Sequence, residues 1–492
     1  MYTLLTGATG LVGRYLVRDL LLSGHQLAVV VRSSRKQSPR DRMEEILQHW
    51  ERELGRPLAR PVVLEGDIAE PGFGFSGEDR DWVGENCDKI IHSAAILEFY
   101  GKDRKGEPWR TNFNGTQNMI NLCRELNILD IHYVSTAYVA GFQTERVMED
   151  SLDVGQSFRN DYEESKFHAE KLVRAIDFAD HVTIYRPAVI SGDSRTGYTN
   201  TYHGLYLYLR LMSVMIPPIP RSPDGSRSTP IRLRMTGEEK RNIIPVDWVS
   251  AVMCRLFETP AARGKTFHIA PDDPITSRRM IEYCSKYFNS TGVEFCGPGE
   301  LPPLTRDGNE DQWMFERVLT ENATTYAPYE STDNVFDMTN TRQFAGDIVC
   351  PELDETIIFR YIDFGNEDRW GKRRAEVDPV DFWAAEAILS TKLEGNSEST
   401  WRVGLDVIGQ GGAQLTVEMS RRGIHGVDRG LPREDSPVLR ISNSSLEAIC
   451  SGRGNLEDLV NGWDCEDITL RRELSEVLAA ALQSREFAST QG

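Results

Sequence analysis

Short apolar runs alternate with amphipathic segments along residues 1–198 of the chain. The runs are typical of buried strands, and the segments between them repeat their apolar residues every three to four positions, as helices do. One such helix is predicted over 43–54. The predicted strands are 2–5, 26–31, 61–68, 89–95, 129–134 and 182–187. Strands that alternate with helices predict an α/β fold with a parallel, doubly wound Rossmann sheet, whose ligands bind beyond the carboxyl ends of the strands.

This alternation is lost in residues 199–365, which we interpret as a substrate cap. Residues 202–212 are apolar and aromatic, so they either line an acyl channel or belong to plain core. Residues 243–270 resume the earlier pattern and are predicted to return to the Rossmann core. A helix is expected over 275–289, and the segment 336–344 is expected to tether the cap.

Residues 366–378 mix basic and acidic side chains and are predicted to be a linker. The remaining residues, 379–492, are expected to form a small α+β domain. Two segments of period-two alternation, 401–408 and 413–419, are joined by a glycine-rich stretch and predict a hairpin. The further elements expected in this domain are a strand at 438–441 and helices at 382–393 and 468–482.

A net charge of −19, from 56 basic and 75 acidic residues, argues against a surface for nucleic acid or for an anionic membrane. No apolar run approaches the roughly 18 residues of a membrane span, and the first strand begins too early to leave room for a signal peptide. The eight cysteines include no C-x-x-C pair, so neither a zinc site nor a disulfide scaffold is indicated. We therefore expect a soluble, cytoplasmic protein without a bound metal.

The stretch 6–13, Thr-Gly-Ala-Thr-Gly-Leu-Val-Gly, lies between the first strand and a helix, which is the context of a dinucleotide-binding turn. In that context Gly7 permits the tight turn, Gly10 lets the backbone approach the pyrophosphate, and Gly13 lets the helix pack closely. The amino terminus of the helix then faces the phosphates. The other predicted cofactor contacts of this stretch are Thr9, Leu11 and Val12.

A basic stretch after the second strand indicates the kind of cofactor. Enzymes that use NAD usually carry an acidic residue here, which accepts a hydrogen bond from the ribose 2′-hydroxyl. This chain has Arg32, followed by Arg35 and Lys36. A 2′-phosphate is the natural partner of such side chains, so NADP(H) is favoured, although a solvated basic loop would have the same composition.

Two further strand ends contribute predicted cofactor contacts. Asp67 either accepts from the adenine amine or caps its own turn, and Ile68 is expected to cover the adenine ring. Ala94 and Ala95 end the fourth strand, where small residues let the backbone pass close to a cofactor. His92 of the same strand is interpreted as a packed core histidine.

Tyr162 and Lys166 stand four positions apart in a predicted helix, so their side chains share one face. The positive charge of an ammonium favours phenolate and is therefore expected to lower the pKa of Tyr162 towards working pH. A phenol tuned in this way can exchange a proton with an oxygen at a reacting carbon. Without further motifs, this pair is also typical of a solvated helix face.

Several motifs together follow the order of the extended short-chain dehydrogenase/reductases, which residues 1–275 resemble. These motifs are 6–13, 92–95, 112–116, 135–137, Tyr162 with Lys166, and Arg186 with Pro187. Within that superfamily, Arg32 and the Asp-Ser-Arg-Thr-Gly-Tyr run at 193–198 resemble the branch of thioester reductases and fatty-acyl-CoA reductases. The resemblance implies a Rossmann core with a substrate cap and NADPH as the cofactor.

The resemblance also implies a role for each matching residue. Tyr162 would donate the proton to the carbonyl oxygen, and Thr136 would hydrogen-bond that oxygen, unless it is only the β-branched end of a strand. Lys166 would hold the nicotinamide ribose, and Asn112 would support the backbone near the site. The further cofactor contacts that the resemblance implies are Arg186, Pro187 and Val189.

We therefore expect an NADPH-dependent reductase of an acyl thioester or a related apolar carbonyl compound, with the acyl group carried by coenzyme A or a carrier protein. Hydride attack on a thioester gives a hemithioacetal, which collapses to an aldehyde and a thiol. Two alternatives stay open: an alcohol dehydrogenase or nucleotide-sugar epimerase/dehydratase, and a non-catalytic sensor that binds NADP(H) and a lipid. No nucleic-acid partner is expected, and a homodimer is compatible with the sequence.

The order of elements in residues 379–492 is similar to that of sterol-carrier-protein-2-like domains, which contain an apolar tunnel. The likeness includes a Leu-Arg-Ile-Ser strand at 439–442 and a glycine-bearing stretch after the next helix. It implies a module that binds a lipid or an acyl group. A dimerisation module or a purely structural one is the alternative.

Overall fold

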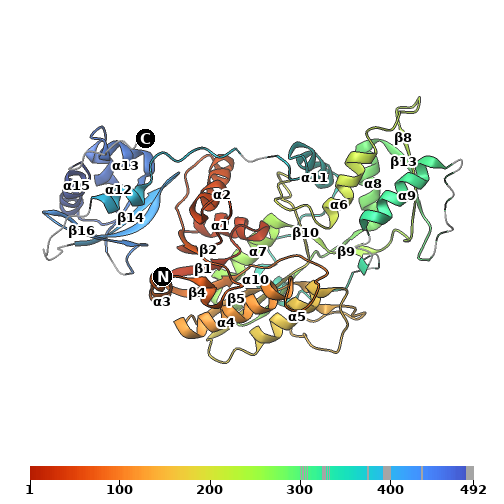
Figure 1. Ribbon diagram of the computed structural model, residues 1–492, viewed down its shortest axis with the longest axis horizontal. Coiled ribbons are helices and arrows are strands. Elements are labelled where there is room, and N and C mark those ends of the chain that lie inside the picture. The colour runs from red at the N-terminus through yellow and green to blue at the C-terminus, as the bar shows by residue number, and fades with distance from the viewer. Residues whose placement is uncertain are drawn as a thin grey trace.

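A computed structural model of the protein describes residues 1–299, 301, 304, 306, 309–323, 328–329, 331, 333–373, 376–391, 401–433 and 436–483. Figure 1 shows a central sheet unit, a cap on one side of it and a small C-terminal module on the other. No helix of these residues combines the length and the apolar character that crossing a membrane requires.

The central sheet has seven parallel strands in the order β11-β6-β5-β4-β1-β2-β3. Its strands are β1 (Tyr2–Thr6), β2 (Leu27–Val31), β3 (Val62–Glu65), β4 (Cys87–His92), β5 (Asp130–Val134), β6 (His181–Pro187) and β11 (Thr266–Ile269). The strand order reverses between β1 and β4, and doubly wound sheets bind their ligands at such a switch point. The predicted fold class is confirmed.

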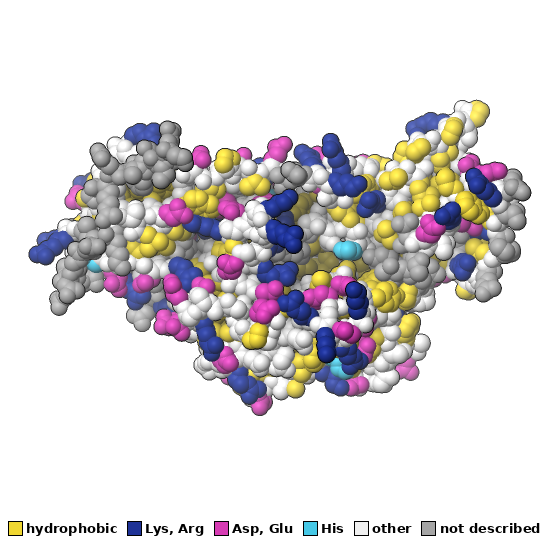
Figure 2. Space-filling model, viewed as in Figure 1, with side chains coloured by type: hydrophobic (Ala, Val, Ile, Leu, Met, Phe, Trp, Pro, Cys, Tyr) yellow, Lys and Arg dark blue, Asp and Glu magenta, His cyan; other side chains and the backbone are white. Residues whose placement is uncertain are grey.

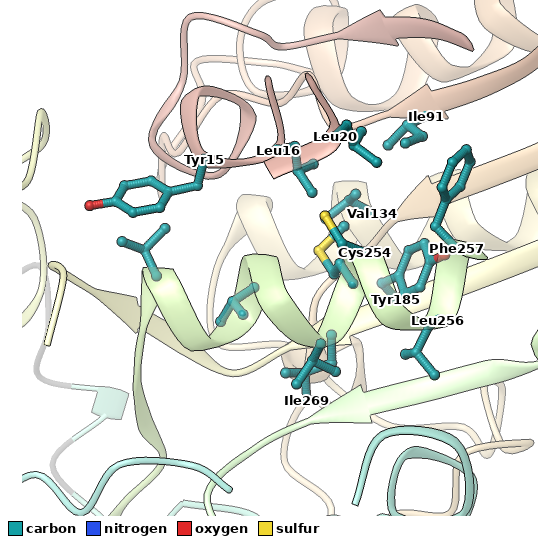
Figure 3. Packing of buried hydrophobic residues seen from close by; sticks show 14 of the residues in the cluster. Tyr15, Leu16, Leu20, Ile91, Val134, Tyr185, Cys254, Leu256, Phe257 and Ile269 are labelled. Atoms are coloured by element: carbon teal, nitrogen blue, oxygen red, sulfur yellow. The ribbon is translucent and has the colours of Figure 1, made fainter. Parts of the chain in front are cut away.

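Helices cover both faces of this sheet (Figure 1). They are α1 (Leu11–Leu22), α2 (Pro39–Leu54), α3 (Gly77–Asn86), α4 (Gly115–Leu126), α5 (Asp161–Arg174) and α7 (Val246–Glu258). On one face, Leu16 of α1 and Leu256 of α7 belong to an apolar layer with Ile91 and Val134 of the strands (Figure 3). Helices α3, α4 and α5 bury the other face.

Helix α2 begins four residues before the predicted start at 43. Ser38 accepts a hydrogen bond from the backbone of Asp41, and the Asp41 carboxylate accepts one from the backbone of Ser38. Pro39 occupies the first helical position, where its missing N–H costs nothing. The prediction relied on the first apolar residue, Met43, whereas polar capping residues start the helix.

The cap contains α6 (Leu205–Met215), α8 (Ser277–Phe288), α9 (Glu310–Ala323) and α11 (Glu355–Glu367). Its strands are β7 (Val189–Ser191), β8 (Arg227–Leu233), β9 (Lys240–Arg241), β10 (Ile243–Pro245), β12 (Ile275–Thr276) and β13 (Ser290–Phe295), which pair as β7 with β10, β8 with β13 and β9 with β12. The helix expected over 275–289 is confirmed. Helix α11 and strand β13 were not predicted, and the boundaries expected at 199, 365 and 378 stay predictions.

The segment after α9 fastens the cap to the sheet unit. Phe336 pairs with Val147 in an isolated parallel β-bridge, and the Val147 backbone N–H donates to Val335. The buried Asp333 carboxylate accepts from the Tyr138 hydroxyl and from the Asn242 backbone N–H. Helix α10 (Thr339–Ala345) follows and packs beside β11. The predicted tether at 336–344 is therefore confirmed.

The C-terminal module has a four-stranded sheet in the order β16-β15-β14-β17. Its elements are α12 (Ala384–Ser390), β14 (Trp401–Ile408), β15 (Ala413–Ser420), β16 (Gly423–Arg429), β17 (Val438–Ser442), α13 (Asn443–Cys450), α14 (Leu456–Gly462) and α15 (Ile468–Gln483). The predicted hairpin is confirmed as β14 and β15, whereas β16 was not predicted. The part of the predicted first helix beyond residue 391 lies outside the described residues.

The module docks at the amino end of β1, opposite the edge where the strands end. The Tyr2 hydroxyl donates to Gln414 at 2.9 Å and accepts from the Leu431 backbone N–H at 2.7 Å. The Trp82 indole donates to the Arg429 carbonyl at 2.9 Å. Between these contacts Gly430 has a φ of +83°, and a Cβ there would lie 3.0 Å from the Trp82 ring.

Candidate active site

The glycine-rich turn after β1 has no room for a side chain at Gly7 or Gly13. Gly7 has a φ of +77°, and a Cβ on it would lie 2.7 Å from the backbone nitrogen of Ala94. A Cβ on Gly13 would lie 2.0 Å from the carbonyl oxygen of Gly7. Gly10 ends the turn, and α1 starts at Leu11 and Val12. The structure thus forms the cradle that a dinucleotide pyrophosphate requires at a helix amino terminus.

Side chains from three other parts of the chain converge on Thr9 of this turn. The Thr9 carbonyl accepts from Arg14 at 3.1 Å and from Asn200 at 3.2 Å. The Thr9 hydroxyl accepts from Arg42 of α2 at 3.4 Å. Arg14 also donates to the Tyr198 hydroxyl at 2.8 Å, so the 193–198 run lies beside the phosphate turn. These bonds fix the backbone that would face the cofactor phosphates.

Arg42 is a residue of this site that the sequence analysis missed. Its guanidinium also donates to the Arg32 carbonyl at 2.6 Å, and the charges of Arg32 and Arg14 add to burial in lowering its pKa. The Arg32 side chain is 66% exposed and lies 3.5 Å from Asp67, while Arg35 and Lys36 are exposed in the same loop. The true start of α2 was the missing signal, because it places Arg42 in the first turn, where its side chain can reach back to this loop.

The contacts of Asp67 and Ile68 favour structural roles over the predicted adenine contacts. Asp67 accepts from the backbone N–H of Ala69 at 3.0 Å, which is the turn-capping alternative. Ile68 is 7% exposed and packs against Gly115 at the start of α4.

The segment after β4 lies against the glycine turn, and the predicted contact of Ala94 and Ala95 with the cofactor stays a prediction. The backbone N–H of Ala94 donates to the Thr6 hydroxyl at 3.2 Å. His92 is fully buried, with Nδ1 3.0 Å from the same hydroxyl. The prediction of a packed core histidine is therefore confirmed, and burial and the charge of Lys166 lower the pKa of His92 to about 3.

Thr136 and Tyr162 meet at the carboxyl end of β5. Thr136 is 5% exposed, and its hydroxyl lies near enough to the Tyr162 phenol to act on the pKa of that phenol. Tyr162 lies in the first turn of α5, whose start is fixed by Asn160, which accepts from the backbone of Glu163. The structure thus brings together the two groups that the resemblance places at a carbonyl oxygen.

The expected fall in the pKa of Tyr162 is wrong. Burial and the charge of the Glu163 carboxylate together raise this pKa to about 12, and only the Thr136 hydroxyl acts in the other direction. Lys166 donates instead to the Tyr133 hydroxyl at 2.9 Å and to the Val134 carbonyl at 2.8 Å. Burial lowers the pKa of Lys166 to about 7, against the charge of Glu170. A phenol with a raised pKa is neutral at pH 7 and therefore carries the proton that a reduction needs.

Asn112 links the loop after β4 to α5. It lies in a single π-helical turn, Arg110–Asn114. Its side chain accepts from the backbone N–H of Ile96 at 2.9 Å and donates to the Ser165 hydroxyl at 3.1 Å. Ser165 in turn donates to the Tyr162 carbonyl at 2.9 Å. These bonds have the backbone-supporting character that the resemblance implies, and π-helical turns often mark functional sites.

The predicted contact of Arg186 with the cofactor is wrong. Its side chain is completely buried and forms an ion pair with Glu170 at 2.6 Å, so it has no surface for a cofactor. The reason is the alternation of β6, which points this side chain into the layer under α5. The next residue, Pro187, lies by the site, where its carbonyl accepts from Thr136 at 3.5 Å. Val189 begins β7 and packs against the apolar cluster of the cap.

Two aromatic side chains near Tyr162 were also missed. The Phe99 ring lies 6.3 Å from that of Tyr162 and 5.7 Å from that of Tyr329. The Tyr329 hydroxyl donates to Glu163 at 2.8 Å, which joins the cap-side segment to α5. Neither residue belongs to a local pattern, because both come from irregular segments that only the tertiary fold brings to this helix.

A glycine cradle at the switch point and a Thr-Tyr-Lys group at the neighbouring strand end are the arrangement of the extended short-chain dehydrogenase/reductase class. More narrowly, the chain belongs to the family described as "Male sterility protein", which matches residues 5–253.

Individual relatives agree with this assignment. The chain is 25% identical over 390 residues to a linear gramicidin synthase of Brevibacillus parabrevis, and the match covers 73% of the chain and 7% of that protein. It is 27% identical over 369 residues to a nonribosomal peptide synthetase of Aspergillus flavus, over 70% of the chain and 34% of that protein. The chain therefore spans well under half the length of these curated relatives.

Solved structures show the same fold. The terminal R domain from the myxalamid PKS-NRPS biosynthetic pathway has a TM-score of 0.58 and 26% identity, over 75% of this chain and 92% of that one. UDP-glucose 4-epimerase from Bifidobacterium longum has a TM-score of 0.51 and 16% identity, over 75% of this chain and all of that one. The second likeness concerns the fold alone.

Proposed function

We propose that the protein is an NADPH-dependent reductase of acyl thioesters. The observation that carries this proposal is the Thr136–Tyr162 pair, with Lys166 one turn further on α5, beside a cradle shaped for a dinucleotide. The resemblance of Arg32 and residues 193–198 to thioester reductases, together with the similarity to the myxalamid R domain, supports a carbonyl group bound as a thioester over other carbonyl substrates. The sugar epimerase shares the fold at much lower identity and gives no comparable support.

The cradle fits the cofactor because its glycines let the turn close: a Cβ on Gly7 would collide with the backbone of Ala94, and a Cβ on Gly13 with that of Gly7. Only the closed turn presents its backbone and the start of α1 to a pyrophosphate. When bound, the reduced nicotinamide supplies a hydride. Thr136 and Tyr162 hold the thioester carbonyl oxygen, and Tyr162 gives it a proton as charge develops there. The hemithioacetal then loses its thiol: the hydroxyl proton passes to the departing sulfur, and an aldehyde remains. Lys166 fixes the ribose side of the site.

An apolar acyl chain fits the surface of the cap. Helix α6 carries apolar residues almost all round, yet only Tyr206 and Leu209 of its residues are fully buried. Hydrophobic side chains gather over this part of the cap in Figure 2, and Val214 of α6 and Met314 of α9 are 61% and 44% exposed. Exposed apolar surface of this kind is typical of a binding site for apolar groups.

The test of this proposal is oxidation of NADPH with a panel of acyl-coenzyme A chain lengths and carrier-bound thioesters. We expect chain-dependent oxidation with one equivalent of free thiol released for each aldehyde formed. Oxidation with free aldehydes or ketones alone would make the protein an ordinary carbonyl reductase. NAD that stays bound through purification would instead favour the epimerase alternative, and normal NADPH binding without any turnover would favour the sensor.

A preference for the 2′-phosphate follows from the arginines beside β2. Arg32→Asp and Arg42→Met are each expected to weaken NADPH binding about 10–100-fold, because each removes a charge-assisted bond to the phosphate. NADH binding should change little. Arg40→Met is the matched control, since Arg40 lies on the same helix but stacks on Trp383 at 3.8 Å.

Fluorescence titration with both cofactors measures this effect. If the variants weakened NADPH and NADH equally, the assignment of Arg32 and Arg42 to the 2′-phosphate would be wrong.

A further inference from the structure

A tyrosine of the cap closes a ring of hydrogen bonds at the start of α5. Asn160 precedes this helix, and its side-chain oxygen accepts from the backbone N–H of Glu163 at 3.0 Å. The nitrogen of the same side chain donates to the Tyr329 hydroxyl at 2.7 Å. Tyr329 in turn donates to the Glu163 carboxylate at 2.8 Å. The Tyr329 hydroxyl therefore bridges the residue before the helix and the third residue of the helix.

The hydrogens of this ring have one consistent assignment. The Glu163 carboxylate also accepts from Arg159, on one oxygen from the guanidinium at 3.3 Å and on the other from the backbone N–H at 3.0 Å. The single hydroxyl hydrogen of Tyr329 is therefore donated to Glu163, while the Tyr329 oxygen accepts from Asn160. The side chains of Glu163 and Arg159 are 0% and 4% exposed. A hydrogen bond to a carboxylate in such surroundings is stronger than one between neutral groups.

Tyr329 is fixed to the cap through its backbone and reaches the site with its ring. The Tyr329 carbonyl accepts from the Arg241 guanidinium of β9 at 2.6 Å. The Tyr329 ring lies 5.7 Å from that of Phe99, and the Phe99 ring lies 6.3 Å from that of Tyr162. Any movement of the cap away from the sheet unit would therefore break the hydrogen bonds that Tyr329 makes at the start of α5.

Tyr162 lies between the two residues that Tyr329 bridges. It is the second residue of α5, directly before Glu163 and two positions after Asn160. The Glu163 charge also acts on the Tyr162 phenol, because it contributes to raising the pKa of that group. A displacement of about 1 Å at a catalytic group can lower a rate roughly 100-fold, so proton transfer depends on how firmly this turn is held.

We propose that Tyr329 is a positioning residue: by bridging Asn160 and Glu163, it lets the cap hold the first turn of α5, and with it the Tyr162 phenol, in place for proton transfer. This inference rests on the proposed function for its kinetic meaning. It gives the cap a task in the chemical step besides binding the acyl chain. It also gives the buried Glu163 carboxylate a function, as the acceptor through which the cap contacts the catalytic helix.

Two substitutions remove the bridge from opposite sides. Tyr329→Phe keeps the ring beside Phe99 but loses both hydrogen bonds. Asn160→Ser keeps a good capping side chain for the helix, but one too short to reach Tyr329. Each is expected to lower kcat for thioester reduction roughly 10–100-fold, while KM and NADPH affinity stay close to those of wild type. The double variant should lose little more than either single variant, because both act through the same bridge.

Tyr138→Phe is the matched control. Tyr138 is buried, its ring lies 5.9 Å from that of Tyr329, and its hydroxyl donates to Asp333 in the segment after α9 at 3.0 Å. This substitution removes a bond between the sheet unit and the cap but none to α5, so kcat should stay close to that of wild type. An equal loss of kcat in Tyr138→Phe and Tyr329→Phe, or a Tyr329→Phe effect confined to KM, would overturn the proposal.

Hydrogen exchange at two backbone amides tests the bridge without a substrate. The Glu163 N–H is bonded to Asn160, and the Arg159 N–H is bonded to the Glu163 carboxylate. Both amides are expected to exchange faster in Tyr329→Phe than in wild type, and at the wild-type rate in Tyr138→Phe. Unchanged exchange in Tyr329→Phe would contradict the proposal.

The two readouts separate this inference from the proposed function. If wild type binds NADPH but reduces no thioester, the proposed function fails, while amide exchange still decides whether Tyr329 holds the start of α5. Thermal unfolding shows whether each variant is folded, and Asn160→Ser keeps the test available should Tyr329→Phe not fold.

Discussion

Tyr162→Phe is expected to lower the turnover of thioester reduction by roughly 10²–10⁴-fold, which is the usual contribution of a general acid. The phenol has a pKa of about 12, so it is neutral at pH 7 and its proton is available throughout the physiological range. The substitution removes only the hydroxyl, and the ring keeps its packing beside Phe99 at 6.3 Å. NADPH affinity should therefore stay close to that of wild type.

Stopped-flow and steady-state NADPH oxidation measure this loss, with Tyr100→Phe as the control. Tyr100 follows Phe99 in the same loop but is 52% exposed, so its hydroxyl should be dispensable. Near-wild-type turnover in Tyr162→Phe would remove Tyr162 from the mechanism.

The second large effect concerns stability rather than turnover. Glu170→Gln is expected to lower the free energy of unfolding by about 3–5 kcal/mol, because it leaves the Arg186 guanidinium buried without its counter-charge. Both side chains of this pair are 0% exposed, and the carboxylate also accepts from Ser135 at 2.6 Å and from Arg174 at 2.9 Å. Urea unfolding measures the change.

Glu164→Gln is the control on the same helix. Glu164 pairs with Arg104 at 2.6 Å, but its side chain is 30% exposed and that of Arg104 is 67% exposed, so the expected change is about 0–1 kcal/mol. If the two substitutions lowered the free energy of unfolding equally, burial would add nothing to the contribution of the Glu170–Arg186 pair.

The contribution of Glu170 to the free energy of unfolding should also depend on pH, and it should be lost in acid. Burial alone raises the pKa of Glu170, but Arg186, Arg174 and Ser135 outweigh it, and the pKa lies below its ordinary value. A carboxyl with a lowered folded-state pKa stabilises the protein above its unfolded-state pKa and loses that contribution as the pH falls through the folded-state value. The difference between wild type and Glu170→Gln should therefore shrink in acid and be constant near neutrality.

Much of the fold could be predicted because its signals are local. The parallel strands are short apolar runs, and the glycine turn is defined by neighbours in sequence. Helix α11 was not predicted because its apolar residues are mixed with charged ones and are buried only against other parts of the cap, which no local pattern reveals. Strand β13 was not predicted because Ser290 is its only buried residue, so it has no apolar face to recognise.

The residues of the site also fall into those that local motifs predict and those that only the tertiary fold brings together. Tyr162, Thr136 and the glycine turn are carried by motifs, so the sequence indicated them. Arg42 and Tyr329 come from outside any motif, and only the fold brings them to the site. The lowered pKa expected for Tyr162 failed because i, i+4 spacing says which face two residues share but not where a long side chain ends.

The docking of the C-terminal module has a consequence for biosynthesis. Tyr2 belongs to the first strand of the central sheet to be translated, yet its hydroxyl partner Gln414 lies 412 positions later in the chain. Domains fold largely in the order in which they are made. Tyr2 and Trp82 therefore lack their module partners until the strands of the module have been translated. A nascent chain halted before β15 would expose these two aromatic side chains as an apolar surface to which chaperones can bind.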